Sequence, residues 1–227
     1  MAATGSRFLE IIVIVVAGLV LAIGWPRLVH SPNPKGATLV LAVTTLTVGA
    51  ALLVQGSEPY LEVMPAAMAV GIIAMCLHPL VHAPARERLA RNLAGTAFGV
   101  LIISCGGVLT STVPHGSSPI VIAGIALAVA ALVDLRTERG GLVAWMMPIG
   151  MVVGGLTGLI AQFALSGEVH PWAALVGVFG AGIAIAMRRM LSQQPAANDV
   201  LGGIASGIAS ILVVGPLLHL VSRLPIS

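Results

Sequence analysis

Charge is scarce in this sequence: 8% of its 227 residues are Asp, Glu, Lys or Arg, whereas 58% are hydrophobic. The connections between its apolar stretches run to only about ten residues, too short for a water-exposed domain. We therefore predict a single transmembrane domain over residues 1–227. The net charge of +3 does not indicate a nucleic-acid partner, because most basic residues lie in connections, where they meet anionic lipids.

Cysteine is also scarce, and several catalytic motifs are missing. Cys76 and Cys105 both fall within predicted helices, which argues against a disulfide framework. The chain has no glycine-rich phosphate loop, no serine nucleophile elbow and no paired zinc signature. We therefore predict that the protein is not an enzyme and uses no cofactor.

Long apolar stretches are what the sequence has in abundance. Each is close to the roughly 20 residues with which a helix crosses a bilayer. The eight stretches are Phe8–Trp25, Ala37–Val54, Tyr60–Val81, Asn92–Thr110, Pro119–Leu135, Gly141–Ser166, Pro171–Met187 and Val200–Val221. The predicted fold is therefore all-α, a polytopic bundle of about eight transmembrane helices.

Basic residues alternate from one connection to the next. The odd-numbered connections carry them and the even-numbered connections carry none. Since cytoplasmic loops are enriched in Lys and Arg, the odd connections are predicted to be cytoplasmic, which puts both chain ends outside the cytoplasm of a plasma-membrane protein. The residues concerned are Arg27 and Lys35; Arg86, Arg88 and Arg91; Arg136 and Arg139; Arg188 and Arg189.

Glycines recur at intervals of four within the predicted helices, and small residues at that spacing let helix backbones approach closely. The sets are Gly95 and Gly99; Gly150, Gly154 and Gly158; Gly203 and Gly207. We predict a compact bundle packed on these faces.

Prolines mark predicted kinks or breaks, because each removes a backbone donor from its helix. They are Pro65 and Pro79 in the third stretch, Pro148 in the sixth and Pro216 in the eighth. The sixth stretch is also long enough to tilt or to split in two.

Polar residues inside the apolar stretches are candidates for function, because burying them in lipid is costly. Glu10, Glu62 and His219 lie near the predicted outer ends of their helices, where they can also reach the interface. Gln162 is a deep amide that either binds a ligand or bonds to a neighbouring helix.

A histidine pair is the one weak candidate for metal binding. His78 and His82 share a helical face if the helix continues past Pro79, and imidazoles at that spacing ligate zinc or copper. The pair has no carboxylate beside it. The alternative reading, which we favour, is two histidines at the membrane interface.

The segment HAPARERLAR, from His82 to Arg91, is the most charged part of the chain. Guanidinium groups bind phosphate bidentately, so Arg86, Arg88 and Arg91 are candidates for seating a lipid headgroup. Arg188 and Arg189 form a second basic pair on the same side. The alternative is that these residues only set the topology.

The stretch HPWAALVGVFGAGIAIAMRRMLSQQPAANDVLGGIASGIASILVVGPLLHLV, from His170 to Val221, resembles the corresponding end of the phosphatidate cytidylyltransferase family. There a Pro-Trp opens a helix, a basic pair ends it on the cytoplasmic side, and a short loop leads into a final helix. Pro171 with Trp172, and Arg188 with Arg189, occupy those places. Upstream, RERLARNLAGTAFGVLIISCGGVL is similar to the family's segment before its fifth or sixth crossing.

The sequence departs from that family where the catalytic groups should be. The family's loop carries acidic and His-Gly-Gly motifs that hold two metal ions and the nucleotide phosphates, but here only Asp199 remains, with Ala205 and Ser206 at expected acidic positions. The family's Ser-Pro-Lys-Lys-Thr-Trp-Glu-Gly run is also missing; the stretch before Gly154 reads WMMPIGMVV. Without carboxylates a two-metal mechanism cannot operate, so the resemblance implies a non-catalytic relative that kept the scaffold.

Two functions are consistent with these observations, and a third, an active lipid-transferring enzyme, is disfavoured by the scarcity of carboxylates. The leading hypothesis is a non-catalytic membrane protein, a lipid-binding or accessory subunit that works beside a cell-envelope or phospholipid enzyme or transporter. It implies anionic lipids and a membrane protein as partners. The alternative is a small transporter or permease for a solute or lipid, whose pathway would use Thr44, Thr45, Thr47, Gln162 and helices broken at Pro65 and Pro148.

Overall fold

The structure, a computed structural model, describes residues 2–54, 61–81, 89–110, 118–137, 145–167 and 171–223. These residues form helices joined by turns, and no strand occurs among them. The elements are α1 (Ala2–Leu28), α2 (Pro34–Val54), α3 (Met64–Val81), α4 (Leu89–Val108), α5 (Ser118–Thr137), α6 (Met146–Ser166), α7 (Pro171–Ser192), the short 3₁₀ helix η4 (Pro195–Asn198), α8 (Val200–Leu212) and α9 (Gly215–Ser222). The predicted all-α fold is confirmed for this part of the chain.

Six spans in the described residues are long and apolar enough to cross a membrane: Phe8–Leu28, Pro34–Val54, Leu89–Val108, Met147–Leu165, Pro171–Ser192 and Val200–Val221. The third predicted stretch contains a shorter apolar helix, Met64–Leu80, and the fifth lies within the 20-residue helix α5. Every predicted stretch therefore overlaps a helix. The multi-pass architecture follows from the six spans, while the count of eight crossings stays a prediction.

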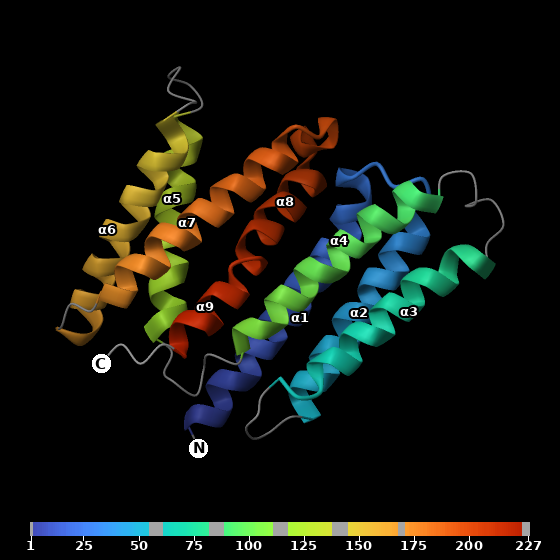
Figure 1. Ribbon diagram of the computed structural model, residues 1–227, viewed down its shortest axis with the longest axis horizontal. Coiled ribbons are helices and arrows are strands. Elements are labelled where there is room, and N and C mark those ends of the chain that lie inside the picture. Colours follow the sequence, from blue (N-terminus) through green and yellow to red (C-terminus); the bar gives the residue numbers. More distant parts are fainter. Residues whose placement is uncertain are drawn as a thin grey trace.

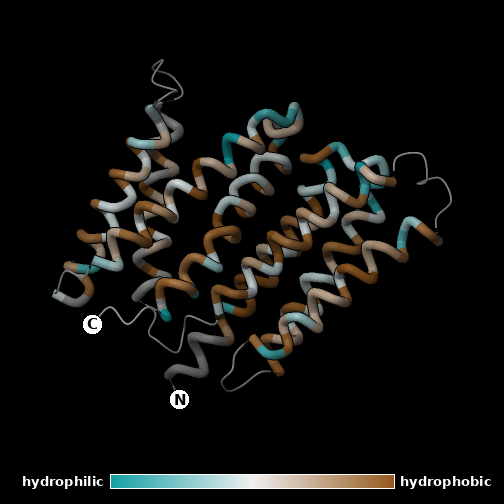
Figure 2. Tube along the Cα trace, in the orientation of Figure 1, coloured by the Kyte–Doolittle hydropathy of each residue, from teal (hydrophilic) through white to brown (hydrophobic). Residues whose placement is uncertain are grey.

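The helices lie side by side and alternate in direction (Figure 1). Helices α1 to α4 pack on one another, as do α5 to α7, and α8 contacts both groups through α1 and α7. The start of α1 and the end of α9 lie at one end of the bundle, and the α1–α2 and α7–α8 connections lie at the opposite end (Figure 1). Figure 2 shows that hydrophilic residues gather at the end formed by these connections.

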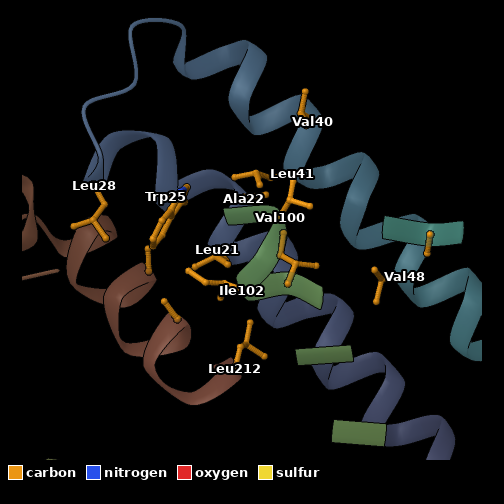
Figure 3. Close-up of a cluster of buried hydrophobic side chains, with 14 of the residues drawn as sticks. Leu21, Ala22, Trp25, Leu28, Val40, Leu41, Val48, Val100, Ile102 and Leu212 are labelled. Atoms are coloured by element: carbon orange, nitrogen blue, oxygen red, sulfur yellow. The ribbon is translucent and has the colours of Figure 1, made fainter. Parts of the chain in front are cut away.

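The main core is centred on α1 and α4. Trp25 and Leu28 of α1, Leu41 of α2, Ile102 of α4 and Leu212 of α8 converge there, as Figure 3 shows. Trp25 is fully buried, and its ring lies 5.6 Å from that of Phe98 between centroids, in a tilted arrangement. Because this core draws on helices from both ends of the sequence, it joins α8 to the N-terminal group.

The second group is held by a glycine contact between α6 and α7. A Cβ added to Gly154 would lie 2.5 Å from the carbonyl oxygen of Gly177 and 2.6 Å from Cβ of Ala181. Gly158 approaches the carbonyl of Ala173 just as closely, and Gly150 lies against Ile185. The predicted packing on the Gly150, Gly154 and Gly158 face is confirmed, because only glycine lets the two backbones come this near.

The predicted glycine face of α8 is wrong by one position. Gly203 is exposed, and a Cβ on Gly207 would meet nothing within 4 Å. The buried face instead runs through Gly202, Ala205 and Ala209. Gly202 packs against the carbonyl of Ala196 in η4, so the turn before α8 fixes which face points inward.

The prolines behave according to their place in the helix. Pro216 follows a real break, since α8 ends at Leu212 and α9 begins at Gly215. Pro65 and Pro148 lie in the first turns of α3 and α6, where a backbone N–H would have no intrahelical partner, so neither breaks its helix. The expected split of the sixth stretch is therefore not found within Met146–Ser166, and α3 also continues past Pro79 to Val81.

Candidate functional site

The packing brings basic residues from four helices to one end of the bundle, here called the basic end. Arg27 lies in the last turn of α1, Lys35 in the first turn of α2, Arg91 in the first turn of α4, and Arg188 and Arg189 in the last turns of α7. The first three side chains are exposed and the last two are half-buried. This end is the strongest candidate for a functional surface, because no other described region gathers so many side chains of one charge.

Arg188 is held at the contact between α7 and α8. Its Nε donates to Oγ of Ser210 over 3.2 Å. Ser210 is fully buried, and its hydroxyl donates in turn to the carbonyl of Gly207 over 2.7 Å. The serine thus orients the guanidinium at the basic end, so that the charge is fixed in place before any anion arrives.

A second group of contacts fixes the connection between α1 and α2. The chain leaves α1 through His30, whose φ of 48° is left-handed, and Ser31 N–H donates back to the carbonyl of Pro26 over 2.8 Å. This helix-ending motif turns the chain sharply. It presents Ser31 to α4, where Ser31 Oγ donates to Oδ1 of Asn92 over 2.7 Å.

The next turn of the same connection is fixed by Asn33. Its Oδ1 accepts from the backbone N–H of Gly36 over 3.1 Å, which caps the start of α2. Its Nδ2 lies 3.4 Å from Nε2 of His78 on α3. The His78 ring rests against Gly36, where any Cβ would collide with it. The contacts with Asn33 and Gly36 therefore explain His78 as a packing residue at the basic end.

The predicted metal pair is only half described, because His82 lies outside the described residues. No group of three or more His, Cys, Asp or Glu residues in the described part of the chain is arranged to hold a metal ion. His78 instead contacts an asparagine amide. Of the predicted headgroup residues, Arg86 and Arg88 also lie outside the described residues.

The predicted intramembrane candidates lie away from the basic end. Glu62 is exposed in the turn before α3, which begins at Met64, so this carboxylate is not inside a helix. Glu10 is half-buried on α1, Gln162 is buried on α6, and His219 is half-buried on α9. Glu10 and Gln162 belong to different groups of helices. These positions do not make up one site with the basic residues.

The threonines considered for a transport pathway have local partners. Thr44 and Thr45 are buried in α2, and their hydroxyls donate to the carbonyls of Val40 and Leu41 over 2.8 and 2.9 Å. Their side chains fill the space left by Gly71 of α3 and Gly18 of α1. Packing accounts for both residues.

Three participants at the basic end were not singled out as site residues from the sequence: Ser31, Asn92 and Ser210. In the sequence, Arg27 and Lys35 indicate only the topology. No local motif marks them, because Ser31 and Asn92 are 61 positions apart and meet only when α4 packs on α1.

No family model, no curated protein and no solved structure matches this chain. The resemblance to the phosphatidate cytidylyltransferase family therefore stays a prediction.

Proposed function

We propose that this chain is a non-catalytic, multi-pass membrane protein whose basic end binds the headgroups of anionic lipids, and that it serves as an accessory subunit beside an envelope or phospholipid enzyme or transporter. The proposal rests on one observation: the helix ends that carry Arg27, Lys35, Arg91, Arg188 and Arg189 lie at the same end of the bundle.

The charge at this end is poorly balanced. Among the side chains that the structure describes, the carboxylate at the basic end is Asp199, which is exposed just before α8. Each basic side chain near an anionic membrane surface contributes about 1 kcal/mol of attraction. A cluster of this size is therefore sufficient to select anionic lipids over zwitterionic ones.

The direct test removes the charges of Arg188 and Arg189. We expect Arg188→Gln with Arg189→Gln to weaken retention of anionic lipid roughly thirtyfold, on the basis of two lost charges. Native mass spectrometry of the purified protein measures the bound lipid. Arg223→Gln is the matched control, since Arg223 is exposed at the opposite end. Equal lipid in the double variant and the control would reject lipid binding at this end.

The accessory role has a separate test. Purification in native lipid is expected to recover a second membrane protein with the wild-type chain, since a protein without its own catalytic groups needs a partner to act on. Recovery of this chain alone with its lipid would leave the lipid-binding part of the proposal standing and reject the accessory part.

The orientation that the proposal needs is also testable. In a variant whose native cysteines are replaced, Glu62→Cys is expected to react with a membrane-impermeant maleimide in intact cells. Ser192→Cys is expected to react only after permeabilisation. Both positions are exposed, and they lie at opposite ends of the bundle. The reverse labelling pattern would place the basic end outside the cytoplasm.

One observation favours the alternative of a small transporter. The last apolar span is interrupted between α8 and α9, and discontinuous helices form the binding sites of many transporters. Proteoliposomes that contain this chain alone should then take up a solute. Absence of uptake across a panel of ions and small metabolites would remove this alternative.

A further inference from the structure

The contact between Ser31 and Asn92 lies at the centre of a second cationic group, distinct from the pair on α7. Arg27 precedes Ser31 by four residues, Lys35 follows it by four, and Arg91 is adjacent to Asn92. The 2.7 Å hydrogen bond between Ser31 and Asn92 therefore joins two segments that carry three basic residues within four positions of the contact. We call these five residues the Asn92 corner.

Further contacts between α1 and α4 fix the shape of the Asn92 corner. Trp25 Nε1 donates to the carbonyl of Gly95 over 2.9 Å, one turn along α4 from Asn92. A Cβ on Gly95 would lie 3.2 Å from Val29, so α1 and α4 are in close contact here. With two bonds between the same pair of segments, the positions of Ser31 and Asn92 are fixed before a ligand binds.

The charges of the corner are not neutralised within the described chain. Arg27, Lys35 and Arg91 are exposed, and none of these three side chains makes a hydrogen bond or an ion pair with another described residue. Helices α2 and α4 also begin at this end, and the start of a helix carries a partial positive charge. Like charges held together repel one another, so an anion at this point would stabilise the native state.

Asn92 supplies a donor of the kind that such an anion needs. Its side chain is only 5% exposed, and its Oδ1 accepts from Ser31, which orients Nδ2 as the remaining donor group. Nδ2 has no hydrogen-bond partner among the described residues. A phosphate oxygen at this position would accept from the donor group that the bond to Ser31 leaves available.

We propose that the Asn92 corner binds a phosphate group, with Nδ2 of Asn92 donating to one phosphate oxygen and Arg27, Lys35 and Arg91 neutralising its charge. Several guanidinium and amide donors suit the several acceptor oxygens of a phosphate better than the single acceptor atom of a halide. The phosphate belongs either to a lipid headgroup or to free phosphate. The lipid source rests on the function proposed above, and the free source does not.

The decisive variant is Asn92→Asp. A carboxylate accepts from Ser31 as the amide oxygen does, so the contact between α1 and α4 is retained, but the donor becomes an anionic oxygen. Binding is followed as the rise in melting temperature in detergent, since a ligand specific to the native state stabilises it. The probes are inorganic phosphate and short-chain phosphatidic acid, each at constant ionic strength against chloride. Phosphatidylcholine is the zwitterionic control.

We expect phosphate to stabilise the wild type, and its apparent affinity to fall about tenfold or more in Asn92→Asp. Arg223→Gln, at the opposite end of the bundle, is the matched control and should keep the response. A response to both probes identifies free phosphate as sufficient, and a response to phosphatidic acid alone identifies the headgroup. Either pattern supports the site if the response is weaker in Asn92→Asp than in the wild type.

Two results would overturn the proposal: no stabilisation of the wild type by either probe, or an equal response in Asn92→Asp. If Asn92→Asp does not fold, Arg27→Gln with Lys35→Gln answers the same question, because both side chains are exposed and their loss leaves the core intact. Failure of the proposed function appears differently, as unchanged lipid retention in the Arg188 and Arg189 variant.

Discussion

Replacing Trp25 with alanine is expected to lower the free energy of unfolding by about 3–5 kcal/mol, the range for removing a fully buried large aromatic side chain. Trp25 is 0% exposed and contacts Phe98. Its removal leaves a cavity between α1 and α4 and also deletes the hydrogen bond to Gly95. Denaturant titration in a fixed detergent, monitored by circular dichroism, measures the loss.

Two further variants separate the causes. Trp25→Phe keeps most of the ring and loses the indole donor, so it should cost less than the alanine variant, with about 0.5–1.5 kcal/mol attributable to the lost hydrogen bond. Trp145→Ala removes a side chain that is 64% exposed and should change stability little. If Trp145→Ala destabilised the protein as much as Trp25→Ala, the core would not be where the structure places it.

Gly154→Leu is the second change with a large expected effect. A side chain at this position has to displace the carbonyl of Gly177 and Cβ of Ala181, so α6 and α7 must separate. Overpacking of this kind costs on the order of 1–3 kcal/mol. The melting temperature in detergent should fall, and Gly154→Ala should already show part of the loss.

Gly207→Ala is the matched control for that prediction. Gly207 lies within α8, and a Cβ there would meet nothing within 4 Å. Since alanine favours a helix over glycine by roughly 0.5–1 kcal/mol, this variant should be neutral or slightly stabilising. Equal losses at Gly154 and Gly207 would show that helix propensity, not the contact between α6 and α7, governs both positions.

The Asn92 corner shows where prediction from the sequence stops. Arg91 was expected to contact a headgroup because it lies in the most charged segment, and that expectation needs no structure. Asn92 begins a predicted helix and has no sequence neighbour that reveals its partner. Its role depends on Ser31, 61 positions away, and on the left-handed turn at His30 that presents the serine to α4.

The effect of a proline or glycine also depends on information beyond its local sequence. Pro148 and Pro216 look alike as interruptions of apolar stretches, yet Pro148 lies in the first turn of α6 and Pro216 follows a break. Both prolines lie in the first turn of a helix, where the lost N–H has no intrahelical partner, but α8 ends shortly before α9 begins, so only Pro216 marks an interruption inside an apolar span. Likewise Gly202 rather than Gly203 faces inward, because the contact of α8 with η4 sets its rotation.

The sequence by itself determined the all-helical fold and the places of the helices, because a chain this apolar and this poor in charge must satisfy its backbone hydrogen bonds within helices. It also determined that basic residues fall at alternate connections, hence at one end of any up-and-down bundle. Only the tertiary structure decided which helices touch, which glycines are covered and which polar groups meet. Those outcomes depend on side chains far apart in the sequence, and no periodicity along one helix records the neighbour against which it packs.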